Sequence, residues 1–228
     1  MTSTAPTTPV STIPFQQQID EFIAQQVSRL PAELLDDLTS PIQELVESRA
    51  AEKALQEGSK APDFTLPDEH GQPVTLSKLL EQGPVVITFY RGVWCNFCNL
   101  EMNAYQHVLP ALQELGASIV AISPQKQEHC LSLIQKNTLT FPVLSDIGNT
   151  VSRQFGLVFT INKRAQNAHN RARKDLPRFN GDDSWELPIP ATYLIDQSGT
   201  IRLAYVDPDF MQRLDPATVV ARIKELKK

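Results

Sequence analysis

Residues 84–98 read PVVITFYRGVWCNFC, a continuous apolar run that leads within a few residues to a Cys-x-x-Cys pair. Short apolar runs of this kind are typical of strands that are buried on both faces of a sheet. Apolar side chains then recur at helical spacing up to Gly116, which predicts an amphipathic helix. A helix N-terminus has partial positive charge and unpaired N–H groups, so it favours a thiolate over a thiol. The stretch therefore predicts a redox site.

The chain has 228 residues, 41% of them hydrophobic, and a formal net charge of -5, as expected of an ordinary globular protein. This charge argues against general nucleic-acid binding, which needs a basic surface. No apolar stretch approaches the roughly 20 residues of a membrane span. Residues 1–9 lack the basic and apolar regions of a signal peptide. Because two of the three cysteines form one pair, we expect a reducing compartment and hence a cytoplasmic protein. From the charge and the short apolar stretches we expect no nucleic-acid or membrane partner.

The sequence divides into three parts. Residues 1–13 are rich in Thr, Ser and Pro and are expected to form a disordered tail. Residues 14–57 are expected to form a helical extension, in which Pro31 and Pro41 separate three helical stretches. The apolar stripe of this extension predicts packing on the main domain, with a homodimer contact as the alternative. Residues 58–228 are expected to form that main domain.

The main domain shows the element order of a thioredoxin-like fold. Predicted strands at residues 84–90 and 117–123 enclose the Cys-x-x-Cys helix, and such β-α-β units are nearly always parallel and right-handed. A hairpin over residues 191–206 and a last helix from Asp215 complete the order. Residues 157–188 are polar, and we expect an irregular insertion there. The predicted fold class is α/β, a thioredoxin-like fold with a helical N-terminal extension.

The sequence also resembles the peroxiredoxin-like branch of the alkyl hydroperoxide reductase C/thiol-specific antioxidant family. The similarity begins with the signature YRGVWCNFCNLE at residues 90–101. Further blocks are AISP at 121–124, FPVLSD at 141–146, PATYLID at 190–196 and YVDPD at 205–209. The resemblance implies a thioredoxin fold and peroxide chemistry at sulfur, with no metal, haem or flavin cofactor.

The spacing of the two thiols constrains where each of them lies. Residues three apart within a helix have Cβ atoms about 5–6 Å apart, whereas a disulfide needs about 3.5–4.5 Å. Cys95 is therefore expected at the non-helical cap position, and Cys98 one turn into the helix. A redox-active pair is the favoured interpretation. The alternatives are two inert core thiols, or a zinc site with further ligands from His129 and Cys130.

Two family patterns overlap at the pair and assign the nucleophile differently. Similarity to thioredoxins, in which Trp precedes the first Cys, implies attack by Cys95. Similarity to ordinary peroxiredoxins implies attack by Cys98, with Glu101 at the position of their Glu. The positions of the peroxide-activating Pro, Thr and Arg of ordinary peroxiredoxins are occupied here by Arg91, Cys95 and Pro190. This chain therefore lacks those three activating residues at the matching positions. From the cap geometry we favour Cys95 as the exposed, acidified nucleophile and Cys98 as its partner, and the reverse order stays open.

Neighbours of the pair supply further candidate site residues. Arg91 would lower the pKa of a nearby thiolate, and Glu101, one turn after the second thiol, is placed to relay a proton. Trp94, Pro190 and Thr192 are expected to line the substrate pocket. Pro190 resembles the cis proline of thioredoxins, with a trans turn proline as the alternative.

The sequence thus predicts a thiol-dependent peroxidase that reduces hydrogen peroxide or organic hydroperoxides through a Cys95–Cys98 disulfide. A thioredoxin- or glutaredoxin-type reductant is expected to recycle it. The basic residues between 163 and 178 predict a solvated surface, with docking of an acidic reductase as the alternative. A protein disulfide reductase with little peroxidase activity is the alternative function, and a redox-regulated binding module is a third.

Overall fold

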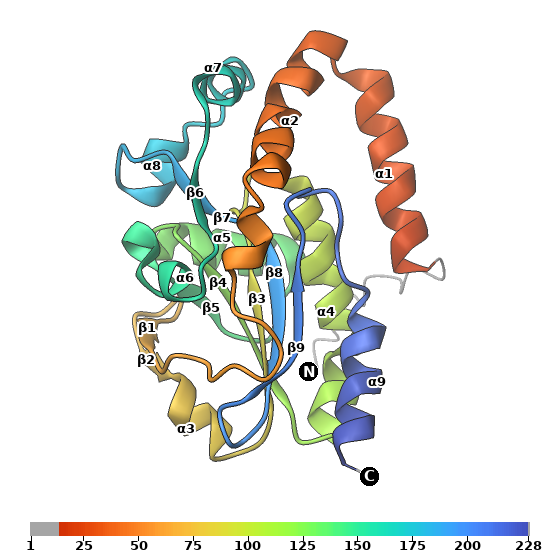
Figure 1. Ribbon diagram of the computed structural model, residues 1–228, viewed down its shortest axis with the longest axis vertical. Helices are drawn as coiled ribbons and strands as arrows, with labels where there is room; N and C mark the ends of the chain where they lie inside the picture. The colour runs from red at the N-terminus through yellow and green to blue at the C-terminus, as the bar shows by residue number, and fades with distance from the viewer. Residues whose placement is uncertain (1–13, 228) are drawn as a thin grey trace, which may run out of the picture.

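The computed structural model describes residues 14–227, and the predicted disordered tail at residues 1–13 lies outside them. The centre of the fold is a five-stranded sheet in the order β5-β4-β3-β8-β9 (Figure 1). Strand β3 pairs parallel with β4 and antiparallel with β8, so the α/β, thioredoxin-like prediction is confirmed. The strands are β3 (Val85–Phe89), β4 (Ser118–Ser123), β5 (Val143–Ser145), β8 (Ala191–Ile195) and β9 (Ile201–Val206).

Strand β3 is buried over its whole length, which explains why its sequence is apolar almost throughout. Its side chains alternate between the two faces of the sheet. Val86 packs into the apolar cluster that includes the thiols, whereas Ile87 and Phe89 pack into a second cluster. Helices α4 (Asn96–Glu114) and α9 (Pro216–Leu226) pack against each other beside the sheet (Figure 1).

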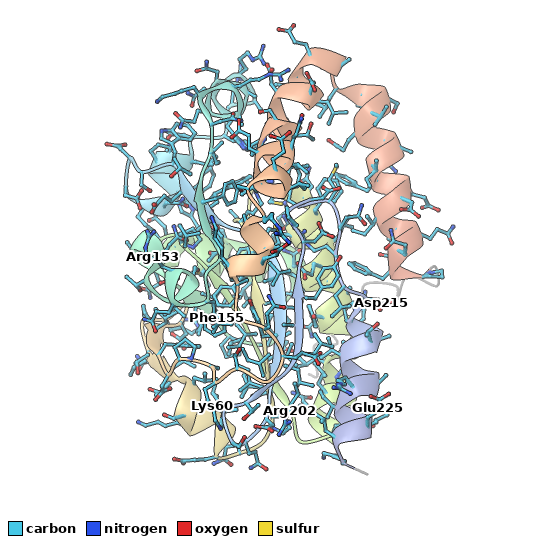
Figure 2. The ribbon with its side chains drawn as sticks, viewed as in Figure 1. Lys60, Arg153, Phe155, Arg202, Asp215 and Glu225 are labelled. Carbon is cyan, nitrogen blue, oxygen red and sulfur yellow. The ribbon has the colours of Figure 1, made fainter. Side chains whose placement is uncertain are left out.

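Helix α9 begins where the sequence predicts. Asp215 is its N-cap, and the carboxylate accepts a hydrogen bond of 2.9 Å from the backbone N–H of Ala217. Pro216 occupies the first helical position, where a missing N–H does no harm. Figure 2 shows Asp215 at the end of α9 that faces the body of the protein. The loop before this cap carries Arg213 to the thiol-bearing end of α4.

The N-terminal extension forms a helical hairpin of α1 (Phe15–Arg29) and α2 (Ala32–Glu47), followed by the short helix η1 (Ala50–Lys53) (Figure 1). Helix α1 packs on α4, and the rings of Phe22 and Phe97 meet edge to face with centres 5.1 Å apart. The prediction that the extension packs on the main domain is therefore confirmed.

Pro41 does not end a helix, so the prediction of a helix boundary at this residue is wrong. Proline lacks the N–H that would bond to the carbonyl of Asp37 one turn earlier. The hydroxyl of Ser40 donates to that carbonyl instead, at 2.8 Å. Because a neighbouring side chain replaces the lost hydrogen bond, α2 continues through the proline.

The segment 157–188 is ordered, so the prediction of an irregular insertion is wrong. Arg164 and Arg171 form ion pairs with Asp37 on α2. These two arginines of the basic stretch thus bind the N-terminal hairpin. The sequence does not reveal these ion pairs, because Asp37 lies more than a hundred positions away from both arginines. The segment comprises β6 (Val158–Thr160), α7 (Lys163–Arg171), α8 (Leu176–Asn180) and β7 (Glu186–Pro188).

Shorter elements complete the fold around the central sheet. Strands β1 and β2 pair as an antiparallel hairpin. No helix within residues 14–227 has the length and apolar character needed to cross a membrane. These elements are β1 (Thr65–Pro67), β2 (Pro73–Thr75), α3 (Leu76–Leu80), α5 (Gln127–Asn137), η2 (Ile147–Asn149) and α6 (Thr150–Gln154).

Candidate active site

The two thiols lie at the start of α4, as their spacing predicts. Cys95 is the N-cap, with an extended backbone at φ -88° and ψ 110°, and Cys98 lies inside the first turn. The amide of Asn99 donates to the carbonyl of Cys95 at 2.7 Å and to that of Val93 at 2.9 Å. These bonds fix the loop that leads into the helix. Both sulfurs are free thiols.

Cys95 is only 3% exposed, so the expectation of an exposed nucleophile is wrong. Phe97 and Phe210 pack edge to face next to it, with ring centres 5.9 Å apart. Residues of α1 and α2 complete the cover, and together these groups enclose a cavity that Cys95 lines. The sequence does not reveal this burial because the covering residues come from separate parts of the chain.

The environment separates the pKa values of the two thiols. Burial alone would raise the pKa of Cys95, but a hydrogen bond from the Cys98 thiol and the charges of Arg91 and Arg213 bring it from 9.0 down to about 5. Burial raises the pKa of Cys98 well above its ordinary value, and the bond to Cys95 adds to this. At neutral pH the arrangement therefore holds a thiolate on Cys95 and a protonated thiol on Cys98.

Arg213 contacts the thiol pair, although nothing in the sequence predicts that it lies there. Its Nη2 donates to Cys98 Sγ at 3.5 Å, and its Nε lies 2.9 Å from Glu101 Oε2. Both charged side chains are 2% exposed. Burial opposes the charge of Arg213, but Glu101 and the two thiols raise the pKa of the guanidinium above its ordinary value. A buried loop arginine has no sequence signature, and only the fold brings it to the thiols.

Glu101 is the centre of a buried polar group behind Cys98. Its Oε1 accepts hydrogen bonds from the hydroxyls of Thr88 at 3.4 Å and Thr192 at 3.5 Å, and Tyr105 donates to Thr192. Burial raises the pKa of Glu101 to about 7, although Arg213 opposes the rise. The carboxyl group is therefore able to exchange a proton near neutral pH.

Arg91 flanks the pair on the side of the cavity. Its guanidinium carbon lies 4.1 Å from the ring centre of Phe210 and 5.0 Å from that of Trp94. Burial lowers the pKa of this guanidinium, and the charges of the two thiols counteract the change. Gly92 permits the close packing of this loop, because its φ is 152° and a Cβ would lie 2.4 Å from Trp94 Nε1.

His169 and Lys174 stand next to Trp94, and both come from the segment that was expected to be irregular. The rings of His169 and Trp94 pack edge to face with their centres 5.1 Å apart. Lys174 Nζ lies 5.7 Å from the centre of the Trp94 ring. Burial, together with the charges of Arg91 and Lys174, lowers the pKa of His169 to about 2. The His169 side chain is therefore uncharged at neutral pH, and it lines the cavity beside Cys95.

The cavity beside Cys95 has a volume of about 460 Å³. Arg91 and Trp94 line it, whereas Pro190 and Thr192 are not among the described residues that do. Pro190 is buried, and its peptide bond is trans, unlike the cis bond that the thioredoxin resemblance implies. The remaining lining residues are Phe22, Ile23, Gln26, Val27, Leu30, Leu35, Leu38, Thr39, Ile42, Asn96, Phe97, His169, Lys174, Asp209, Phe210 and Met211.

The third thiol, Cys130, does not line this cavity. Cys130 is fully buried, and burial raises its pKa to about 12. Among residues 14–227, no group of three or more His, Cys, Asp or Glu side chains is arranged to hold a metal ion.

Comparison with known proteins gives consistent matches. The family model described as AhpC/TSA matches residues 58–204. The chain is 30% identical over 151 residues to the chloroplastic peroxiredoxin Q of Sedum lineare, covering 66% of this chain and 69% of that protein. It is 34% identical over 103 residues to a putative peroxiredoxin of Mycobacterium tuberculosis, covering 45% and 67%. The crystal structure of peroxidoxin BcpB from M. tuberculosis superposes with a TM-score of 0.61 at 23% identity, covering 76% of this chain and 99% of that one.

Proposed function

Because the chain belongs to the AhpC/TSA family and is a thiol-dependent peroxidase, we propose that Cys95 and Cys98 form its redox centre. The observation that supports this assignment is the separation of the two pKa values, which leaves a thiolate on the cavity-lining Cys95 and a thiol on Cys98. The helix N-cap, Arg91 and Arg213 all favour that thiolate.

In the first step the Cys95 thiolate attacks one oxygen of the peroxide. A sulfur–oxygen bond forms as the O–O bond breaks, so sulfur loses two electrons and the peroxide gains them. Cys95 becomes a sulfenic acid. The departing hydroxide or alkoxide takes a proton and leaves as water or an alcohol. Arg91 is the cation placed to stabilise the negative charge that develops on the departing oxygen.

In the second step Cys98 attacks the sulfenic sulfur of Cys95. A disulfide forms, the S–O bond breaks, and the hydroxyl leaves as water with the proton that Cys98 gives up. Arg213, 3.5 Å from Cys98 Sγ, stabilises the second thiolate as it forms, and Glu101 is placed beside Arg213 to exchange that proton.

A dithiol reductant of the thioredoxin or glutaredoxin type then restores both thiols by exchange. Because Cys95 is 3% exposed, exchange with a protein requires that the N-terminal hairpin moves away.

We further propose that the chain consists of a tail at residues 1–13, a helical extension at 14–57 and a peroxiredoxin-like domain at 58–228. We also propose that the protein is cytoplasmic and forms a homodimer.

The proposed activity is tested by mixing reduced protein with hydrogen peroxide in a stopped-flow instrument while the fluorescence of Trp94 is followed. We expect a fast phase with a rate linear in peroxide concentration, because Trp94 adjoins the oxidised sulfur. A rate no higher than that of a free thiol would contradict the peroxidase assignment and favour the disulfide reductase, which insulin reduction would then measure.

The same reaction should depend on pH with an apparent pKa of about 5. The pKa of Cys95 is lowered, so the reactive thiolate is fully present above this value and is lost as the pH falls through it. We expect a rate constant that is constant between pH 7 and pH 9. A free cysteine, with a pKa of about 8.5, would instead react faster across that range. Circular dichroism at each pH controls for unfolding.

A further inference from the structure

The N-terminal hairpin lies outside the segment that the family model matches, which begins at residue 58. It nevertheless supplies a large part of the cavity over the reactive thiol. Phe22, Val27 and Leu30 come from α1 and the residue that ends it, and Leu35, Leu38 and Ile42 come from α2. The cover of Cys95 is thus a feature of this chain beyond the matched domain.

The size and the lining of the cavity fit an organic molecule better than hydrogen peroxide. Water occupies about 30 Å³ per molecule in the liquid, so a molecule little larger than water fills a small part of 460 Å³. Most lining side chains are aliphatic or aromatic, and an apolar ligand would displace water from them. Small-molecule sites have typical volumes of about 300–1,000 Å³ and a predominantly apolar lining.

Polar groups suited to a hydroperoxide occur at the Cys95 end of the cavity. Arg91 is 4% exposed, and its Nε–H has no hydrogen-bond partner among residues 14–227. His169 is 2% exposed, and neither ring nitrogen has a hydrogen-bond partner in the part of the chain that the structure describes. The carboxylate of Asp209, which also lines the cavity, already accepts from Met211 and Gln212. Unpaired buried donors are costly unless a ligand satisfies them, and the two oxygens of a hydroperoxide are acceptors.

We propose that the α1–α2 hairpin is a substrate-binding element that holds the apolar body of an uncharged organic hydroperoxide, with its O–O group at Cys95 beside Arg91. This inference rests on the proposed peroxidase function and assigns the binding of the organic part of the substrate to this hairpin. The step is the one described above: the thiolate takes the terminal oxygen, and the organic part leaves as an alcohol after gaining a proton. A folded protein cannot reach Cys95 while the hairpin covers it, whereas a small organic molecule can enter the cavity.

The test compares cumene hydroperoxide with hydrogen peroxide as substrates of the full chain. The variant Val27→Glu places a charge at the cavity, and Val46→Glu is its matched control on the same hairpin. Val27 is 60% exposed and lines the cavity, whereas Val46 is 57% exposed and does not. The readout is the ratio of kcat/KM for cumene hydroperoxide to that for hydrogen peroxide. A second variant, Leu35→Trp, fills the cavity without adding charge.

We expect the wild-type ratio to exceed one, and to fall about tenfold or more in Val27→Glu and Leu35→Trp, since apolar pocket contacts discriminate by roughly 10–200-fold. The ratio in Val46→Glu should stay within about twofold of wild type. A wild-type ratio below one, or a ratio that both cavity variants leave unchanged, would overturn the inference. If neither peroxide reacts faster with the protein than with a free thiol, the proposed function itself fails.

Protection of Cys95 from alkylation tests binding in the cavity independently of peroxide turnover. Cumyl alcohol has the shape of the substrate but no O–O bond, so it should occupy the cavity without oxidising the thiol. We expect it to slow alkylation of Cys95 by iodoacetamide in the wild type and in Val46→Glu, and to lose this effect in Val27→Glu. Alkylation that is equally fast with and without the alcohol in the wild type would also overturn the inference.

Discussion

Substituting Cys95 by serine should lower peroxide turnover by at least about a thousandfold, because the substitution removes the nucleophile. Cys98→Ser should behave differently. Cys95 remains and is oxidised once, but no adjacent thiol resolves the sulfenic acid, so steady turnover with a dithiol reductant should be lost. The measurement is peroxide consumption under a dithiol reductant, together with the amplitude of the first fluorescence phase.

Cys130→Ser is the matched control for these two variants. Cys130 is also fully buried, but it lies outside the cavity lining. Its activity should stay within about twofold of wild type. Turnover by Cys95→Ser above a tenth of the wild-type value would contradict the assignment of Cys95 as the attacking residue.

Substituting Arg213 by methionine should affect both the stability and the chemistry of the protein. Arg213 and Glu101 form a buried ion pair with both side chains 2% exposed. Removing one partner of such a pair typically costs about 3–5 kcal/mol, because the other charge is left buried and alone. The loss should appear in the free energy of unfolding measured with urea. Arg213 lowers the pKa of Glu101, which is about 7 in the wild type, so its removal should raise that pKa further. The loss should therefore grow as the pH rises above 7, where the wild-type carboxyl is ionised and paired with Arg213, whereas the variant has no partner for that charge.

The chemical effect of Arg213→Met is separable from its effect on stability. The charge of Arg213 lowers the pKa of Cys95, so its removal should shift the pH profile of Cys95 alkylation to higher pH. The double variant Glu101→Gln/Arg213→Met should recover much of the lost stability while the shifted profile remains. Arg213→Lys keeps the charge and should keep most of the low pKa.

Arg222→Met supplies the control, because Arg222 pairs with Glu225 on the surface and its side chain is 37% exposed. Such pairs contribute about 0–1 kcal/mol, and the pH profile of alkylation should not change. An Arg213→Met protein with a wild-type alkylation profile would show that this residue has no part in activating the thiols.

The sequence predicted those features that local pattern determines. The apolar run of β3, the Cys-x-x-Cys pair after it and the placement of Cys95 at the helix cap follow from hydrophobic period and disulfide geometry. The start of α9 follows from Asp215 and Pro216 in the same way. Each of these signals lies within a few residues of the element that it specifies.

The features that the sequence did not predict depend on contacts between distant segments. Arg213 is 115 positions from the thiol to which it donates, and no pattern in its loop distinguishes it from a solvent-exposed arginine. The cover over Cys95 combines α1 and α2 with residues near 169 and 210. Pro41 was expected to end a helix because proline usually does, and one serine hydroxyl reverses that outcome.

The order of attack is tested most directly by trapping the sulfenic acid. Cys95→Ser and Cys98→Ser are each treated with one equivalent of hydrogen peroxide in the presence of a sulfenic-acid-specific carbon nucleophile, and the labelled residue is identified by mass spectrometry. If the Cys95 thiolate attacks the peroxide, Cys98→Ser should carry the label on Cys95, and Cys95→Ser should remain unlabelled. Label found only on Cys98 in the Cys95→Ser protein would contradict this account and make Cys98 the peroxidatic residue.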